Sequence, residues 1–289
     1  MYGNIFLKVC DMKTIKLFFL FMLLGVMLTN KASAQNVLDG IYIREHAPSK
    51  RVIPYTPLRE ADVMYLKRIW RIIDLREKIN HPLYFPTEKI MDRQSMTQLI
   101  YDAVMTGSSV TPYGTLDDEF TMTLTVAEVE ATTTKIDTEF IEDEYGDVQP
   151  VPIKEEFWPG AVKRYRLKEE WVFDNQKSVL EARIIGMCPV SEKYDENGEY
   201  KGEMPLFWLY FPEARELFAT VPVYNRHNDA ERRTLEDIIW KRMFSSYIFK
   251  QTNVYDRKIS DYKTPLDLLL ESKAIENEIF DYEQDLWEY

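Results

Sequence analysis

Residues 206–211 form an unbroken apolar run, Leu-Phe-Trp-Leu-Tyr-Phe. A strand with one solvent-exposed face alternates apolar and polar side chains. A run that is apolar at odd and even positions alike therefore needs both of its faces buried. Helices of the same chain or a partner protein can provide the second cover, and the sequence leaves both open. Because tryptophan and tyrosine are enriched at binding hot spots, we take Trp208 and Tyr210 as candidate interface residues.

Other segments of the middle third alternate with period two, which predicts strands over 120–126, 165–173 and 179–190. Asn197-Gly198 is a preferred hairpin dipeptide and predicts a turn between the 179–190 strand and the run at 206–211. Sequential strands with short turns favour an antiparallel sheet. The acidic segment 137–147 is expected to be a solvated loop, able at most to collect divalent cations weakly.

Helical periodicity and start signals flank this β-rich middle. An apolar stripe predicts a helix over 58–80 that ends at His81-Pro82, and Ser95 begins a shorter one over 95–105. Pro212 suits the first turn of a helix through 218, and Thr234 begins one that runs to about 250. Thr264-Pro265 repeats the start signal. We predict a single α+β domain over 58–289, with a central antiparallel sheet packed with N-terminal and C-terminal helices.

The first 34 residues have the pattern of an export signal. Lys13 and Lys16 precede the apolar run 17–28, and Ala32-Ser33-Ala34 follows it. The run is shorter than the ~20 apolar residues that a membrane-spanning helix needs. We therefore expect a signal peptide at 1–34, cleaved after Ala34, and an exported mature chain. Cleavage removes four lysines and one aspartate, which leaves 32 basic and 47 acidic residues, a net charge of −15.

Residues 35–57 lack helical periodicity and contain three prolines, which favour extended structure. We interpret this segment as an extended arm that lies on another surface. Two basic residues of the arm, Arg44 and Arg51, are interface candidates. A second basic and aromatic cluster follows the sheet region, and its Tyr224, Arg226, Arg232 and Arg233 are candidates for contact with an acidic partner. For this cluster, a solvated loop remains the alternative.

No catalytic, metal or cofactor motif stands out. The three histidines are isolated, and the sequence has no nucleophile elbow, phosphate-binding loop or dinucleotide-binding fingerprint. Cys188, the one cysteine of the mature chain, falls in an apolar strand and is expected to be an inert core thiol. The acidic net charge argues against nucleic acid as a partner. We expect no catalytic residue and no cofactor, with a periplasmic hydrolase using an unrecognised carboxylate site as the alternative.

Three long stretches closely resemble the gliding-motility family GldN, also called PorN. They are REHAPSKRVIPYTPLREADVMYLKRIWRIIDLREKINHPLYFP, FWLYFPEARE and VYNRHNDAERRTLEDIIWKRMFSSYIFKQTNVYDRKISDYK. The resemblance implies a non-catalytic periplasmic component of the type IX secretion machinery. It implies a ring of many copies with an outer-membrane lipoprotein of the GldK or PorK type, and contact with the inner-membrane motor protein GldM or PorM. Association with the membrane would then be indirect, through the lipoprotein.

Overall fold

The computed structural model describes residues 50–107, 110–116, 118–142, 148–155, 157–195, 199–226, 228, 230–231 and 233–286, with the backbone alone at 135–142 and 148–155. The predicted signal peptide, the first part of the predicted arm and the predicted turn at Asn197-Gly198 lie outside these residues. No helix among the described residues has both the length and the apolar character needed to cross a membrane.

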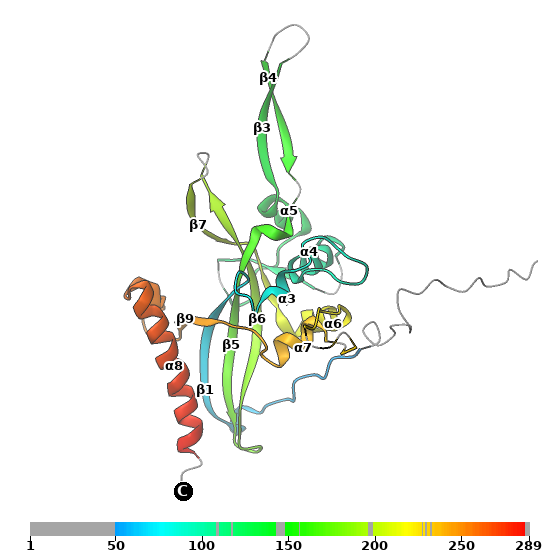
Figure 1. The fold of residues 1–289 in the computed structure, drawn as a ribbon. Helices are drawn as coiled ribbons and strands as arrows, with labels where there is room; N and C mark the ends of the chain where they lie inside the picture. The colour runs from blue at the N-terminus through cyan, green and yellow to red at the C-terminus, as the bar shows by residue number, and fades with distance from the viewer. Residues whose placement is uncertain are drawn as a thin grey trace, which may run out of the picture. The chain divides into compact units, whose positions relative to one another are not determined.

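A seven-stranded antiparallel sheet forms the centre of the described fold (Figure 1). Its order is β2-β8-β6-β5-β1-β9, and β7 pairs with β6 beside this path. The strands are β1 (Val63–Asp74), β2 (Pro112–Tyr113), β5 (Val162–Asp174), β6 (Val179–Tyr194), β7 (Tyr200–Pro205), β8 (Trp208–Tyr210) and β9 (Tyr247–Gln251). Strands β3 (Lys135–Glu142) and β4 (Val148–Glu155) form a separate two-stranded sheet.

Short helices connect these strands, and a long one ends the described chain. They are α3 (His81–Tyr84), α4 (Met96–Met105), α5 (Val126–Thr133), α6 (Phe211–Thr220), α7 (Leu235–Trp240) and α8 (Pro265–Asp285), with 3-10 turns η1 (Glu60–Asp62), η2 (Pro159–Ala161) and η3 (Ile259–Asp261). The α+β class predicted from the sequence is therefore confirmed.

The predicted helix starts at Ser95, Thr234 and Thr264 are confirmed. Each hydroxyl accepts a hydrogen bond from the backbone N–H three residues on, at 3.1, 3.3 and 3.4 Å. Such a cap satisfies a donor that the first helical turn leaves without a partner. Pro212 lies in the first turn of α6, also as predicted. These signals are local in the sequence, which is why they could be read there.

The helix predicted over 58–80 is wrong. Most of that segment is β1, which pairs with β5 from Val63↔Asp174 to Asp74↔Arg164. The end of β1 is buried on both faces, so apolar residues stand at odd and even positions alike. Ile69, Trp70 and Ile73 then fall at spacings that also fit a helical stripe. His81-Pro82, predicted to end a helix, begins α3 instead.

Two further boundaries differ for a similar reason. The strand predicted over 120–126 is a loop with a single bridge, Tyr113↔Thr123, followed by α5 with its capping box at Thr125. Of the alternating threonines there, Thr123 forms the bridge and Thr125 caps α5. The helix predicted to reach residue 250 stops at Trp240, and the chain returns to the sheet as β9 beside β1. Both outcomes depend on pairing with distant segments, which local periodicity does not report.

The run at 206–211 is only partly a strand. Residues 208–210 form β8 and Phe211 begins α6, while the hairpin partner of β6 is β7. The segment expected to be an acidic loop contains the end of β3, and its residues 143–147 lie outside the described residues. Trp208 is 6% exposed and Leu209 is fully buried, so the chain itself covers both faces of β8.

Helices cover one face of the sheet in two separate groups. Helices α4, α6 and α7 pack on Ile73, Tyr165 and Leu167, and form the larger core. Helix α8 lies beside β9, and its Ile275 and Ile279 form a smaller core with Ile69 (Figure 1). On the opposite sheet face, Trp70, Cys188 and Trp208 pack together under the loop that carries Phe120.

A buried polar cluster lies between the two cores. Glu169 of β5 is fully buried, and its Oε2 lies 3.2 Å from Arg71 Nε and 3.0 Å from Arg242 Nη2. Arg71 also donates to Glu276 of α8 at 2.6 Å. One carboxylate thus connects two strands, the turn after α7 and, through Arg71, the last helix. A buried charge that loses its partner is strongly destabilising, so these groups depend on one another.

We expect Glu169→Ala to lower the free energy of unfolding by about 3–5 kcal/mol, because it leaves Arg71 and Arg242 without their shared carboxylate. Glu170→Ala is the matched control, since the neighbouring Glu170 pairs with the more exposed Arg68 and should lose about 1 kcal/mol or less. Urea denaturation of the mature chain measures both. Equal losses would contradict the role assigned to Glu169.

We also expect Cys188 to resist thiol reagents in the folded chain. Its side chain is fully buried, and burial raises the pKa of the thiol to about 12, so little thiolate forms at neutral pH. Labelling by a colorimetric disulfide reagent should therefore follow the rate of unfolding and become rapid in urea. Rapid stoichiometric labelling of the native chain would overturn this expectation.

Candidate functional site: an apolar groove with a basic rim

A groove of about 960 Å³ opens beside α3 and α7. Its walls come from three segments, residues 78–94, residues 222–226 with Arg233, and residues 238–243. Its apolar lining includes Ile79, Phe85, Ile90, Tyr224 and Met243, all of which are substantially exposed. An exposed apolar surface of this kind on a folded domain is typical of an interaction site.

Asn80 fixes two of the groove walls relative to each other. Its side chain is fully buried, donates to the carbonyls of Asp74 and Ser245 at 2.7 and 3.0 Å, and accepts from the Ser245 N–H at 2.9 Å. These bonds hold the start of α3 against the segment that follows Met243. The groove is therefore built on rigid backbone, which lowers the entropy cost of binding a ligand there.

The rim of the groove is basic. Lys78, Arg93, Arg226 and Arg233 line it, and no carboxylate is among its described lining residues. Arg233 pairs with Glu231 at 2.8 Å, but the other three cations have no carboxylate within 4.0 Å among the described side chains. In a chain with a net charge of −12, this concentration of positive charge favours an acidic partner.

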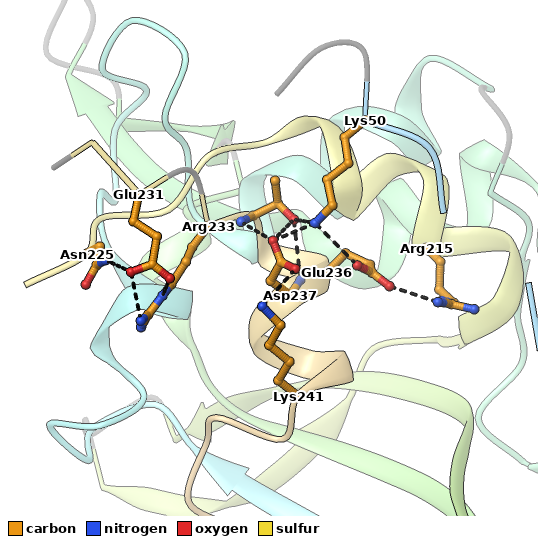
Figure 2. A network of polar contacts seen from close by, with 9 residues as sticks. Lys50, Arg215, Asn225, Glu231, Arg233, Glu236, Asp237 and Lys241 are labelled. Atoms are coloured by element: carbon orange, nitrogen blue, oxygen red, sulfur yellow. Dashed lines mark hydrogen bonds and ion pairs between the residues drawn. The ribbon is translucent and has the colours of Figure 1, made fainter. Parts of the chain in front are cut away.

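A polar network holds the loop that forms one wall (Figure 2). Asn225 donates to Glu231 at 2.5 Å, Arg233 donates to the same carboxylate, and the Val223 N–H donates to the Arg233 carbonyl at 2.8 Å. The ion pair and hydrogen bonds lower the pKa of Glu231, so the carboxylate stays charged. The loop is thereby closed on itself and presents Tyr224 and Arg226 outward.

The same network reaches the end of the predicted arm. Lys50 Nζ lies 2.9 Å from Thr234 Oγ1 and 2.5 Å from Asp237 Oδ2 at the start of α7 (Figure 2). Burial raises the pKa of Asp237, but the Lys50 hydrogen bond and other contacts outweigh it and the net shift is downward. Tyr55 then packs its ring 5.1 Å from Trp240. The described part of the arm, 50–57, thus packs on its own chain.

The structure brings together three of the interface candidates chosen from the sequence. Tyr224 (57% exposed), Arg226 and Arg233 all line the groove. Arg51 is exposed away from it, and Tyr210 packs against Phe120 at 5.7 Å. Trp208 is inside the fold, as described above. Arg44 and Arg232 lie outside the described residues.

The sequence analysis missed the opposite wall of the groove. Lys78, Ile79, Phe85, Ile90 and Arg93 come from a segment that carries no recognisable binding motif, and only the fold places them opposite Tyr224. The aromatic string at 82–86 with its two prolines was the one available hint, because proline interrupts regular structure within a few residues and such connecting segments tend to lie at the surface.

The chemistry of the groove is that of recognition. Its residues offer apolar contact, cation–π stacking and ion pairing. Among the described residues, no three His, Cys, Asp or Glu side chains gather as a metal site would require. The fold and groove together define an α+β protein with a surface suited to a peptide or helix of another protein.

A family model, gliding motility associated protein GldN, matches residues 58–288. The chain belongs to this family, and it is a component of the gliding-motility and type IX secretion machinery. None of the curated proteins matches the chain.

We expect Lys50→Met to destabilise the mature chain by about 1 kcal/mol at pH 7, because Asp237 loses a charged hydrogen-bond partner. Since the folded-state pKa of Asp237 is lowered, the contribution is present above the unfolded value of about 3.9 and is lost as the pH falls through the folded value. The difference from wild type should thus shrink as the pH is lowered below about 3.9. Urea midpoints measured between pH 2 and 7 test this.

Lys241→Met is the control for Lys50→Met. Lys241 faces the same carboxylate at 3.5 Å, but it is more than half exposed and should contribute less. A Lys50→Met effect that persists unchanged at pH 2 would show that packing of the lysine stem, and not the ion pair, carries the stabilisation.

Proposed function

We propose that the chain is a non-catalytic structural component of a periplasmic ring, formed with an outer-membrane lipoprotein of the GldK or PorK type and in contact with the motor protein GldM or PorM. Export by a signal peptide cleaved after Ala34 and attachment to the outer membrane through the lipoprotein belong to the same proposal. Family membership supports the setting. The observation that carries the structural role is the apolar groove, on whose rim three cations have no carboxylate within 4.0 Å among the side chains that the structure describes.

A ring of many copies needs more than one contact surface on each copy. The groove offers one surface for an acidic, apolar segment. In our proposal, residues 35–49 provide the second contact surface. The chain that follows residue 49 is already fixed to its own subunit by Lys50 and Tyr55. Both surfaces would act by binding, without chemistry on a substrate.

The alternative function, a periplasmic hydrolase with a catalytic carboxylate, has less support than the ring component. The hollow of about 590 Å³ beside α8 contains Glu276, and Glu169 is nearby, but both are ion-paired with arginine. Burial raises the pKa of Glu276, but the contacts with Arg71 and Lys273 together outweigh this effect. The net shift of the pKa is therefore downward. A general acid needs the opposite shift.

We expect Arg226→Glu to abolish or strongly reduce the high-mass particle that the mature chain should form when co-expressed with its lipoprotein. Reversing one unpaired rim charge costs an acidic contact about 1.4 kcal/mol or more, which is roughly tenfold in affinity. Negative-stain microscopy and mass photometry of the co-purified material measure the particle.

Lys201→Glu is the matched control, since it makes the same charge change on the exposed β6–β7 hairpin, where Lys201 pairs only with Asp195 at 2.9 Å. Particles that tolerate Arg226→Glu as well as Lys201→Glu would remove the groove from the proposal. Wild-type protein that yields no particle with the lipoprotein would overturn the ring itself.

A further inference from the structure

Helix α8 has apolar side chains on two of its faces. Ser272, Ile275 and Ile279 are buried against the sheet, as a surface helix requires. In the first turns, Leu266, Leu269 and Leu270 point outward and are 71, 52 and 64% exposed. These three leucines stand at positions i, i+3 and i+4, the spacing with which a helix places anchors in the groove of a partner.

Exposed aromatic side chains also lie on the segment that precedes α8 in the sequence. Tyr262 is substantially exposed, and Arg257 stacks between it and Tyr255 with the guanidinium carbon 4.9 and 4.7 Å from the two ring centres. Together with Leu266, Leu269 and Leu270, these residues form what we call the leucine face. Nothing in the described chain covers this face, although three leucines side by side would be costly to leave in water.

Acidic side chains predominate on the helix that carries the outward leucines, although Arg257 belongs to the leucine face and Glu271 pairs with Lys263 at 3.6 Å. Helix α8 carries seven carboxylates and one lysine, and Asp267 and Glu271 flank the leucines directly. In the described part of the chain, the groove's Lys78, Arg93 and Arg226 have no carboxylate within 4.0 Å. An acidic helix with apolar anchors is thus the chemistry that the groove would select, and α8 of this same chain has it.

The groove and the leucine face share no residue, so one copy can use both at once. We propose that the groove of one copy binds the leucine face of α8 of a second copy. Such a contact is heterologous, because it joins two different surfaces, and its repetition yields a closed ring or an open helix and not a symmetric dimer. The inference rests on the proposed function in that it names the contact between neighbouring subunits.

The contact of one helix face is small compared with the ~800 Å² per partner of a standard interface. We therefore expect weak association of the isolated chain, which calls for covalent capture. The mature chain suits this approach, because the one cysteine among its described residues is the buried Cys188. Two variants of the full mature chain with one added cysteine each, Leu270→Cys and Tyr224→Cys, are mixed at equal concentration and treated with a short bismaleimide.

We expect a cross-linked dimer in the mixture at least tenfold above that of either variant alone. The control mixture pairs Leu270→Cys with Tyr200→Cys, whose ring is equally exposed but lies on β7 away from the groove. Adding Leu266→Asp to the Leu270→Cys chain should reduce the product at least tenfold. Leu269→Cys serves as a second probe should Leu270→Cys fail to fold by circular dichroism.

Cross-linking to Tyr200→Cys as efficient as that to Tyr224→Cys, or a product insensitive to Leu266→Asp, would overturn the contact. Its failure is distinguishable from failure of the proposed function. Particles with the lipoprotein that persist without the cross-link refute this contact alone, whereas a specific cross-link without any particle supports the contact and refutes the lipoprotein ring.

Discussion

Glu169 is a fully buried carboxylate that lies 3.2 Å from Arg71 and 3.0 Å from Arg242. Burying these charges is expensive, and their attraction compensates only where the geometry holds all of them together. The cluster thereby imposes a condition on the fold: β1, β5, the turn after α7 and α8 must be in place at once. It also divides the helical cover of the sheet into two cores, because neither apolar group can extend across buried ions.

The groove depends on that condition. Arg242 is the second residue after α7 and has a positive φ of 52°, so the chain turns sharply there and Met243 reaches the groove. Two residues later, Ser245 exchanges hydrogen bonds with Asn80, which positions the start of α3 and the wall that follows it. The recognition surface is thus built from the same short turn that completes the buried ion cluster. Stability of the core and shape of the groove are two consequences of one set of contacts.

The elements that can be predicted from the sequence are those that depend on residues close together in the chain. Strands β5 and β6 and the caps at Ser95, Thr234 and Thr264 rest on neighbours in the sequence, and they were predicted correctly. Strands β1 and β9 were read as helix, because burial on both faces removes alternation from β1, and only the Ile69–Ile72 pairing defines β9. At the groove, the clustered Tyr224 and Arg226 were found, whereas Lys78 and Arg93 carry no local signal and gain significance only from the fold.

A chain with an excess of negative charge repels its own copies. Any association among such chains must therefore place a basic surface of one copy against an acidic surface of the next, and the apolar contact must lie where the two meet. Among the described residues, three cations without a carboxylate within 4.0 Å, Lys78, Arg93 and Arg226, line one apolar groove. Two carboxylates, Asp267 and Glu271, flank the outward leucines of α8. Because like charges oppose every other arrangement, this distribution favours head-to-tail contact over face-to-face pairing. The acidic composition that argued against nucleic acid thus becomes part of how the orientation of neighbouring copies is selected.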